Sequence, residues 1–438
     1  MACRPNAPRL SRSQLFLLFS VTLAGVSGPT LVPPSIPSMS ESLGVSPTSG
    51  ALILSIYTLP GVIAAPVIGY LADRYGRKAV MTPALVLHGL AGGACMFAPD
   101  FKILLMLRLL QGIGSAGLVN LVVVTLGDLL EGITRTRYIG YNAAVLTVGT
   151  TSFPTLGGML ASRNWRHAYL PYWGVLGVAL GIAVLLPNTK GSIRSSPTVQ
   201  RNGSLMGESR KRESFPKGFI ANVAEVLSLP ALRRLMLRGF VLFLLIFGGI
   251  MAAVPVMLKE RFHASALTIG AFLTAGSVLS MIMSSNGGRL QQRVGFVNIL
   301  LMGFLAYSAG MLGLAIASEA GSRLLALAAI AMCGAGEGMS IVALQARATE
   351  VAPPGLRGTS VAMFVSSARL GQTTGPVVAK VGLDRLGFIS CFFAFAGIAA
   401  LMSLEQARVI TRIKSSDIEQ TQTAKSVRNQ GEVQSGET

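Results

Sequence analysis

The stretch "GYLADRYGRK", residues 69–78, places two glycines, one acid and three bases between two long apolar runs. The flanking stretches, 50–71 and 79–98, are charge-poor. Each has about the 20 residues that a transmembrane helix needs. The stretch is therefore predicted to be a short polar loop between two membrane-spanning helices.

The same apolar pattern recurs along the chain of 438 residues, of which 51% are apolar and 13% charged. That charged fraction is about half the value typical of soluble domains. Charge-poor stretches of spanning length lie at 14–35, 50–71, 79–98, 101–126, 138–161, 168–186, 236–257, 265–287, 296–317, 323–346, 358–381 and 385–404. The fold class expected is an all-α integral membrane protein with twelve transmembrane helices.

The distribution of bases predicts the topology. Bases gather before the first span, in the loop after the second, in the loop after the fourth and in residues 187–235, whereas the alternate gaps contain few. By the positive-inside rule the N-terminus (1–13), the linker (187–235) and the polar tail (406–438) are predicted to be cytoplasmic, in a multi-pass protein of the cell (inner or plasma) membrane. Topology then explains most of the net charge of +19, so no nucleic-acid partner is expected.

The two halves of the chain, 14–186 and 236–405, resemble each other. At a fixed offset of 222 residues, Gly112, Gly114, Asp128, Arg135, Gly149 and Pro154 correspond to Gly334, Gly336, Glu350, Arg357, Gly371 and Pro376. At an offset of 219, Gly69, Leu71, Arg74 and Gly76 correspond to Gly288, Leu290, Arg293 and Gly295. Duplicated halves joined by a polar linker predict two six-helix bundles around a central cavity, an architecture suited to alternating access.

Asp73 is the informative residue of the opening stretch. A carboxylate at a helix C-terminus opposes the helix dipole, so it requires a compensating partner. If that partner lies in the other bundle, the pair forms a latch that holds the cytoplasmic side closed; alternatively, the loop charges only enforce topology. The repeat copy has Gln292 at the corresponding position, so a second latch is expected to be weaker.

The loop resembles that of the major facilitator superfamily, whose pattern G-x-L-x-D-R-x-G-R-K is complete here at Gly69, Leu71, Asp73, Arg74, Gly76, Arg77 and Lys78. The resemblance implies a twelve-helix, drug:proton antiporter-like secondary transporter. In that family the loop is understood to stabilise the outward-facing state, partly through an acid after the fourth helix. Asp128 would fill that role.

Two further motifs resemble the same family. "RLLQG" at 108–112 resembles its arginine motif, and Arg108 with Gln111 is expected to face a cavity, or else Arg108 snorkels outward. "GTTSFPTLGG" at 149–158 resembles the antiporter pattern G-x-x-x-G-P-x-x-G-G, with Phe153 in place of a glycine. The helix-bending and packing residues assigned to this motif and its duplicate are Gly149, Pro154, Gly157, Gly158, Gly371, Gly375 and Pro376; an ordinary packing kink is the alternative.

Proton coupling requires a titratable group at cavity depth. The candidates are Glu337, Arg369 and His88, near the middle of the tenth, eleventh and third spans. Glu337 and Arg369 are expected to lie in one bundle, where they could pair and exchange with substrate or proton. A structural ion pair is the alternative, and His88 is more simply a packed residue.

The function predicted is proton-coupled export of a small organic compound. Proton-coupled uptake is the alternative within the same class, and a nontransporting membrane sensor is an alternative of another class. The chain lacks the phosphate-binding pattern G-x-x-x-x-G-K-[ST]. No enzymatic activity, cofactor or metal site is expected, and the partners are the substrate, protons and the lipid bilayer, with no requirement for an oligomer.

Overall fold

The computed structural model describes residues 10–187, 223–351 and 357–434, without the side chains of residues 65, 66, 69, 70, 73, 349, 357, 358 and 410–434. Within these ranges all regular structure is helical. The first bundle comprises α1 (Arg12–Thr30), η1 (Pro33–Ser35), α2 (Ile36–Ser42), α3 (Pro47–Gly50), α4 (Leu52–Thr58), α5 (Gly61–Tyr75), α6 (Arg77–Ala94), η2 (Cys95–Phe97), α7 (Phe101–Ser115), α8 (Leu118–Leu129), α9 (Gly132–Ala161), η3 (Trp165–Tyr169) and α10 (Pro171–Leu185).

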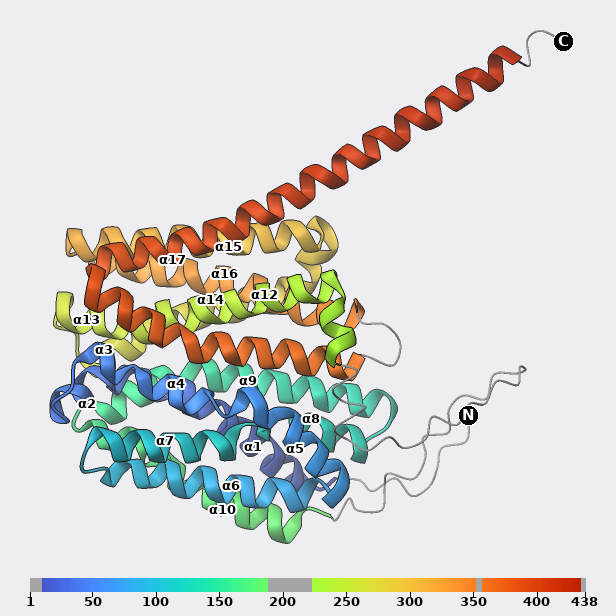
Figure 1. Cartoon of the computed structure of the whole chain (residues 1–438). Coiled ribbons are helices and arrows are strands. Elements are labelled where there is room, and N and C mark those ends of the chain that lie inside the picture. The colour runs from blue at the N-terminus through green and yellow to red at the C-terminus, as the bar shows by residue number, and fades with distance from the viewer. Residues whose placement is uncertain (1–9, 188–222, 352–356, 435–438) are drawn as a thin grey trace.

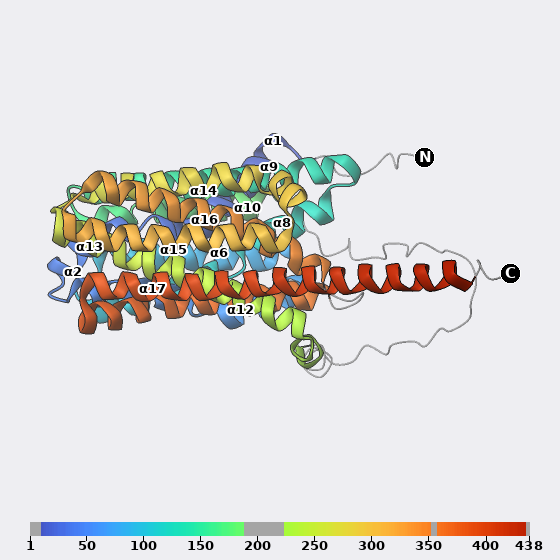
Figure 2. The same cartoon turned by 90° about the horizontal axis from the view of Figure 1, so that it is seen from above.

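The second bundle lies beside the first, with its helices running in the same general direction (Figures 1 and 2). It comprises α12 (Pro230–Leu245), the π-helical segment η4 (Ile246–Ala253), α13 (Val254–Phe262), α14 (Ala266–Val294), α15 (Phe296–Ala320), α16 (Arg323–Glu350) and α17 (Arg357–Gln434).

The prediction of an all-helical membrane protein is confirmed. Over the described residues, 11 helical stretches are long and apolar enough to cross a membrane. The last of them, Thr359–Val409, has 51 residues, enough for two crossings. Gly387 (φ 74°) interrupts it, because positive φ breaks the helix and glycine alone adopts it without strain. The layout is therefore consistent with twelve crossings.

The predicted boundaries between the bundles and the polar segments fall partly on described residues. Of the linker, residues 188–222 lie outside the described part, and α12 already begins at Pro230. The tail predicted from residue 406 is a helical continuation of α17 up to Gln434, and it projects away from both bundles (Figure 1).

The duplication is visible in the backbone. Gly76 (φ 97°) separates α5 from α6, and its counterpart Gly295 (φ 83°) separates α14 from α15 in the same way. A Cβ added at Gly112 would lie 2.1 Å from the carbonyl oxygen of Tyr57, and one at Gly334 would lie 2.0 Å from that of Gly276. Corresponding glycines thus bring corresponding helices into backbone contact in both halves.

The bundles share a hydrophobic core near one end of the molecule. We call the end where α1 begins at Arg12 the N-terminal face and the opposite end, which contains α2 and α3, the far face. Near the far face Ile36 and Met39 of the first bundle share one hydrophobic core with Met257 and Leu258 of the second. A separate core in the other half of the first bundle contains residues of that bundle alone.

Threonine hydrogen bonds connect the bundles. The Thr274 hydroxyl accepts from the Thr155 hydroxyl at 2.8 Å and donates to the carbonyl oxygen of Thr151 at 3.0 Å. On the other side of the interface the hydroxyls of Thr58 and Thr373 lie 3.0 Å apart. At the far face itself, the Thr48 hydroxyl donates to the Asp384 carboxylate at 2.6 Å. The molecule is therefore closed at the far face.

Candidate functional site

The predicted loop of residues 69–78 forms a single tight turn. α5 ends at Tyr75, the backbone N–H of Gly76 donates to the carbonyl of Ala72, and α6 begins at Arg77. The guanidinium of Arg74 lies 5.5 Å from the centre of the Tyr75 ring, and Lys78 is partly exposed. The side chain of Asp73 and the packing at Gly69 lie outside the described part of the structure, so the latch remains a prediction.

Asp128 anchors this loop within its own bundle. Its carboxylate accepts a hydrogen bond of 2.9 Å from Nε of Arg77, which is 8% exposed. In the second copy, Glu350 instead accepts from Arg347 of the same helix at 3.2 Å, and both side chains are about half exposed. An exposed pair of this kind contributes roughly 0–1 kcal/mol. Among the described residues, the second loop therefore lacks the cross-helix tie of the first.

Arg108 is fully buried at 0% exposure, so it neither faces an open cavity, as expected, nor snorkels outward. Its guanidinium donates to Oε1 of Gln111 at 2.7 Å and to the carbonyl oxygen of Gly28 at 2.9 Å, and it stacks 4.4 Å from the centre of the Tyr57 ring. These contacts join α7 to α1 and α4. Among the described residues no carboxylate pairs with Arg108, which is unusual for a charge inside a membrane protein.

An aromatic cage that the sequence did not predict encloses Arg108. His88 lies edge-on to Tyr172, with ring centres 5.4 Å apart, and its Nδ1 lies 3.3 Å from the carbonyl oxygen of Gln111. The hydroxyls of Tyr57, Tyr169 and Tyr172 make no hydrogen bond of good geometry, although those of Tyr57 and Tyr172 lie near Ser115 and Ser27. His88 is thus a packed residue of this cage.

Arg369 reaches across to the first bundle. Its Cδ and Nε would lie 3.2 and 3.3 Å from a Cβ placed on Gly61 of α5. Its Nη1 donates to Oε1 of Gln372 at 3.0 Å. This pair repeats the spacing and the hydrogen bond of Arg108 and Gln111. Gly61, against which Arg369 lies, follows Tyr57 by four residues.

Glu337 and Arg369 do not form the expected ion pair, because Arg369 turns toward α5 rather than toward α16. Glu337 is partly exposed and has no hydrogen-bond or ion-pair partner among the described residues. Its neighbours fix the helix: a Cβ on Gly336 would lie 2.4 Å from the carbonyl oxygen of Gly303, and one on Gly338 would lie 2.3 Å from that of Ser280. Glu337 is thus held between close backbone contacts to α15 and α14.

The glycines around Pro154 are packing positions, with distinct partners. A Cβ on Gly157 would lie 1.8 Å from the carbonyl oxygen of Leu31 in the same bundle, whereas one on Gly158 would lie 2.4 Å from that of Ala266 in the other bundle. In the duplicate motif, Gly371 and Gly375 contact the backbone of α12 within their own bundle, and Pro376 is buried. α9 continues through Pro154 as one helix.

Comparison with known proteins identifies the family. The sequence pattern of the Major Facilitator Superfamily matches residues 15–376. The chain belongs to this superfamily. It is 28% identical over 399 residues to the tetracycline resistance protein, class G, of Vibrio anguillarum, covering 88% of this chain and 92% of that protein. It is 35% identical over 158 residues to the bacillibactin exporter of Bacillus subtilis, covering 34% of this chain and only 39% of the exporter.

Solved structures share the superfamily fold. The crystal structure of the nucleoside transporter NupG superposes with a TM-score of 0.71 at 11% identity, covering 90% of this chain and 99% of that one. The crystal structure of a D-xylose-proton symporter gives 0.70 at 14% identity, covering 90% and 96%. At these identities the structures inform on the fold alone; the family match shows the chain to be a multi-pass membrane transporter.

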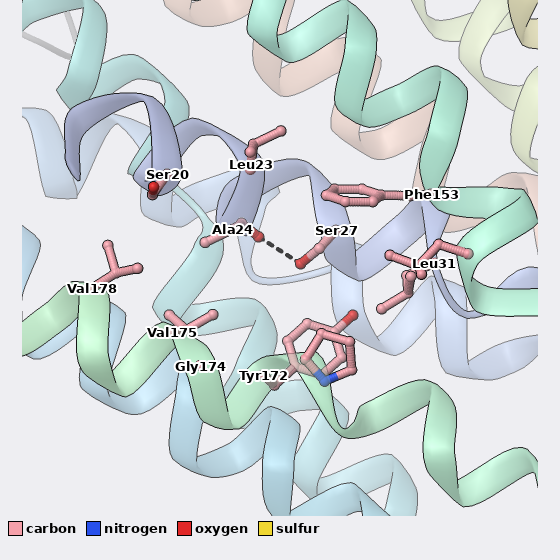
Figure 3. A pocket seen from close by; sticks show the side chains of 12 residues that line it. Ser20, Leu23, Ala24, Ser27, Leu31, Phe153, Tyr172, Gly174, Val175 and Val178 are labelled. Atoms are coloured by element: carbon pink, nitrogen blue, oxygen red, sulfur yellow. Dashed lines mark hydrogen bonds between the residues drawn. The ribbon is translucent and has the colours of Figure 1, made fainter. Parts of the chain in front are cut away.

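Phe153, where this chain departs from the superfamily's antiporter pattern, lines a crevice of about 170 Å³ (Figure 3). The crevice lies between α1, α9 and α10, and it is mostly apolar. It is lined by Ser20, Leu23, Ala24 and Ser27 of α1, by Leu31 just after α1, and by Tyr172 and Val175 of α10. The aromatic ring, rather than a glycine, therefore occupies the space in front of α1.

We expect Phe153→Gly to retain transport and to lose less stability than the roughly 3–5 kcal/mol typical of truncating a buried phenylalanine. The ring is partly exposed, so lipid or solvent can fill the enlarged crevice. Transport rate and thermal unfolding of the purified protein provide the test, with Phe304→Gly, at a fully buried position, as the control for the full cost. Loss of transport by a folded Phe153→Gly protein would give Phe153 a role of its own.

Proposed function

We propose that this superfamily member is a proton-coupled exporter of a small organic compound that works by alternating access, with both termini cytoplasmic. The tetracycline resistance protein and the bacillibactin exporter, both similar in sequence, support export. Closure of the bundles at the far face, which the base distribution predicts to be external, fits one end state of such a cycle.

The observation that carries proton coupling is Glu337. Other described acids lie near helix ends or are paired, as Glu405 is with Arg238 at 2.8 Å. Glu337 instead lies in the middle of α16, partly exposed and without an ion-pair partner in the described part of the chain. An unpaired carboxylate at this depth is costly as a charge and gains stability from a proton, which makes it a suitable proton carrier.

Glu337→Gln is expected to abolish proton movement driven by substrate, because a glutamine amide does not take up a proton at physiological pH. The measurement uses energised inverted vesicles containing a pH-sensitive dye, to which a library of compounds is added. We expect release of protons on addition of an exported compound with the wild type and none with the variant.

The control is Glu319→Gln, since Glu319 is exposed at the end of α15 and should leave proton release unchanged. Retained coupling in Glu337→Gln would move the proton site elsewhere. If protons enter right-side-out vesicles while the compound accumulates in them, the protein is a symporter for uptake and the proposal of export is wrong.

A further inference from the structure

The middle of the membrane contains more positive than negative charge. Arg108 and Arg369 both lie there, and Glu337 is the one described carboxylate at similar depth. Neither arginine forms an ion pair with a described residue. Each donates from its side chain to the neutral glutamine three residues later, at 2.7 Å for Arg108 and 3.0 Å for Arg369. A guanidinium has five N–H donors, so most of the donors of Arg369 remain available.

Tyr57 connects the two cations. Arg108 covers one face of its ring at 4.4 Å, and Arg369 of the other bundle lies against Gly61, four residues after Tyr57 in the chain. The Tyr57 side chain is 2% exposed and its hydroxyl has no hydrogen bond of good geometry. Two cations beside a phenol favour hydrogen-bond donation by its hydroxyl to an anion.

Access to this site is through Arg369 and not through Arg108. Arg108 is sealed at 0% exposure, with the Tyr57 ring stacked on it. Arg369 is partly exposed and lies along Gly61, where the absence of a side chain leaves room for it. The junction is fixed by the adjacent hydrogen bond between Thr58 and Thr373 at 3.0 Å.

We propose that the Arg369 guanidinium and the Tyr57 hydroxyl bind an anionic group of the substrate, of the carboxylate or phenolate class, where the two bundles meet, and that Arg108 supports it as a second cation. The proposal rests on the proposed transport of a small organic compound. Because α4 contributes Tyr57 and α17 contributes Arg369, the anion site is complete only while the two bundles are in contact at mid-membrane.

The test is equilibrium binding to the purified full-length protein, with probes of similar shape and different charge. The pairs are 2-naphthoate with 2-naphthamide and fluorescein with the cationic rhodamine 110. We expect the anion of each pair to bind about tenfold more tightly or better, equivalent to about 1.4 kcal/mol. Arg369→Gln should remove this preference, Arg369→Lys should keep part of it, and Arg289→Gln, at an exposed position in α14, should leave it unchanged.

Equal or tighter binding of the neutral or cationic probes, absence of binding by both anions, or a preference that survives in Arg369→Gln would each overturn the proposal. If Arg369→Gln fails to fold, Tyr57→Phe removes the hydroxyl alone and should weaken binding of the anions and spare 2-naphthamide. Binding requires no proton gradient. An anion preference without proton coupling would therefore reject the proton-coupled function and keep this site. Proton coupling without an anion preference would reject only the site.

Discussion

Gly158→Ala is expected to prevent the two bundles from closing at the far face and to leave each bundle folded. The new Cβ would lie 2.4 Å from the carbonyl oxygen of Ala266, so the backbones of α9 and α14 must separate. A backbone atom cannot move aside as a flexible side chain can. We expect transport to fall by about tenfold or more, because a change of about 1.4 kcal/mol in closure shifts that equilibrium tenfold.

The measurement is the distance between spin labels at positions 48 and 384, which are hydrogen-bonded at 2.6 Å when the far face is closed. We expect longer distances in Gly158→Ala than in the labelled wild type. Gly270→Ala should reproduce the effect from the opposite helix, because its Cβ would lie 2.3 Å from the carbonyl oxygen of Pro154. Unchanged distances together with unchanged transport would show that these glycines do not control closure.

The adjacent Gly157 supplies the matched control. A Cβ there would lie 1.8 Å from the carbonyl oxygen of Leu31 in the same bundle, so Gly157→Ala should destabilise the fold itself, by about 1–3 kcal/mol as for other overpacked sites. Gly174→Ala, with no atom within 4 Å of the new Cβ, should change neither stability nor transport. Thermal unfolding reports on folding, and the distance between the spin labels reports on closure. Measured together for Gly158→Ala, Gly157→Ala and Gly174→Ala, they separate the two effects.

The fold was predictable from sequence because lipid imposes simple rules. Spanning length and the ungapped repeat identified the helices, and the turns at Gly76 and Gly295 have the corresponding positive φ that the repeat implies. The extension of α17 to Gln434 was not predicted as a helix. Polarity alone indicates solvation, and it does not distinguish a helix from another solvated form.

The facing of the helices was much less predictable, since a bilayer is as apolar as a core and leaves little amphipathic signal. Glu337 and Arg369 belong to the same bundle, which suggested that their side chains would meet. Arg369 instead turns to Gly61 in the other bundle. Tyr57 carried no motif at all. The one signal in the sequence was that Tyr57 is a polar aromatic residue within an apolar span.

Arg108→Met is expected to abolish most transport while changing the free energy of unfolding by no more than about 2 kcal/mol. Methionine fills a similar space and removes the cost of burying a charge, and the acceptors it leaves without this donor, Gly28 O, Ile53 O and Gln111 Oε1, are neutral. The variant nevertheless lacks the cation that stacks on Tyr57, so we expect it to lose transport. Arg108→Lys keeps the charge but loses the planar fork that contacts Gln111, Gly28 and Tyr57 together, so it should also be impaired.

Arg166→Met is the control that separates these roles, because Arg166 also packs on an aromatic ring and donates to a carbonyl. Its guanidinium lies 4.6 Å from the centre of the Trp165 ring and 3.2 Å from the carbonyl oxygen of Ala98, near the far face. Initial transport rates and thermal unfolding are measured for all three variants. If Arg108 were a structural residue alone, its variants would lose transport only in proportion to unfolding, as Arg166→Met would. Loss of transport by a folded Arg108→Met protein would instead give the buried cation a role in transport beyond stability, as its stacking on Tyr57 next to the junction of the bundles leads us to expect.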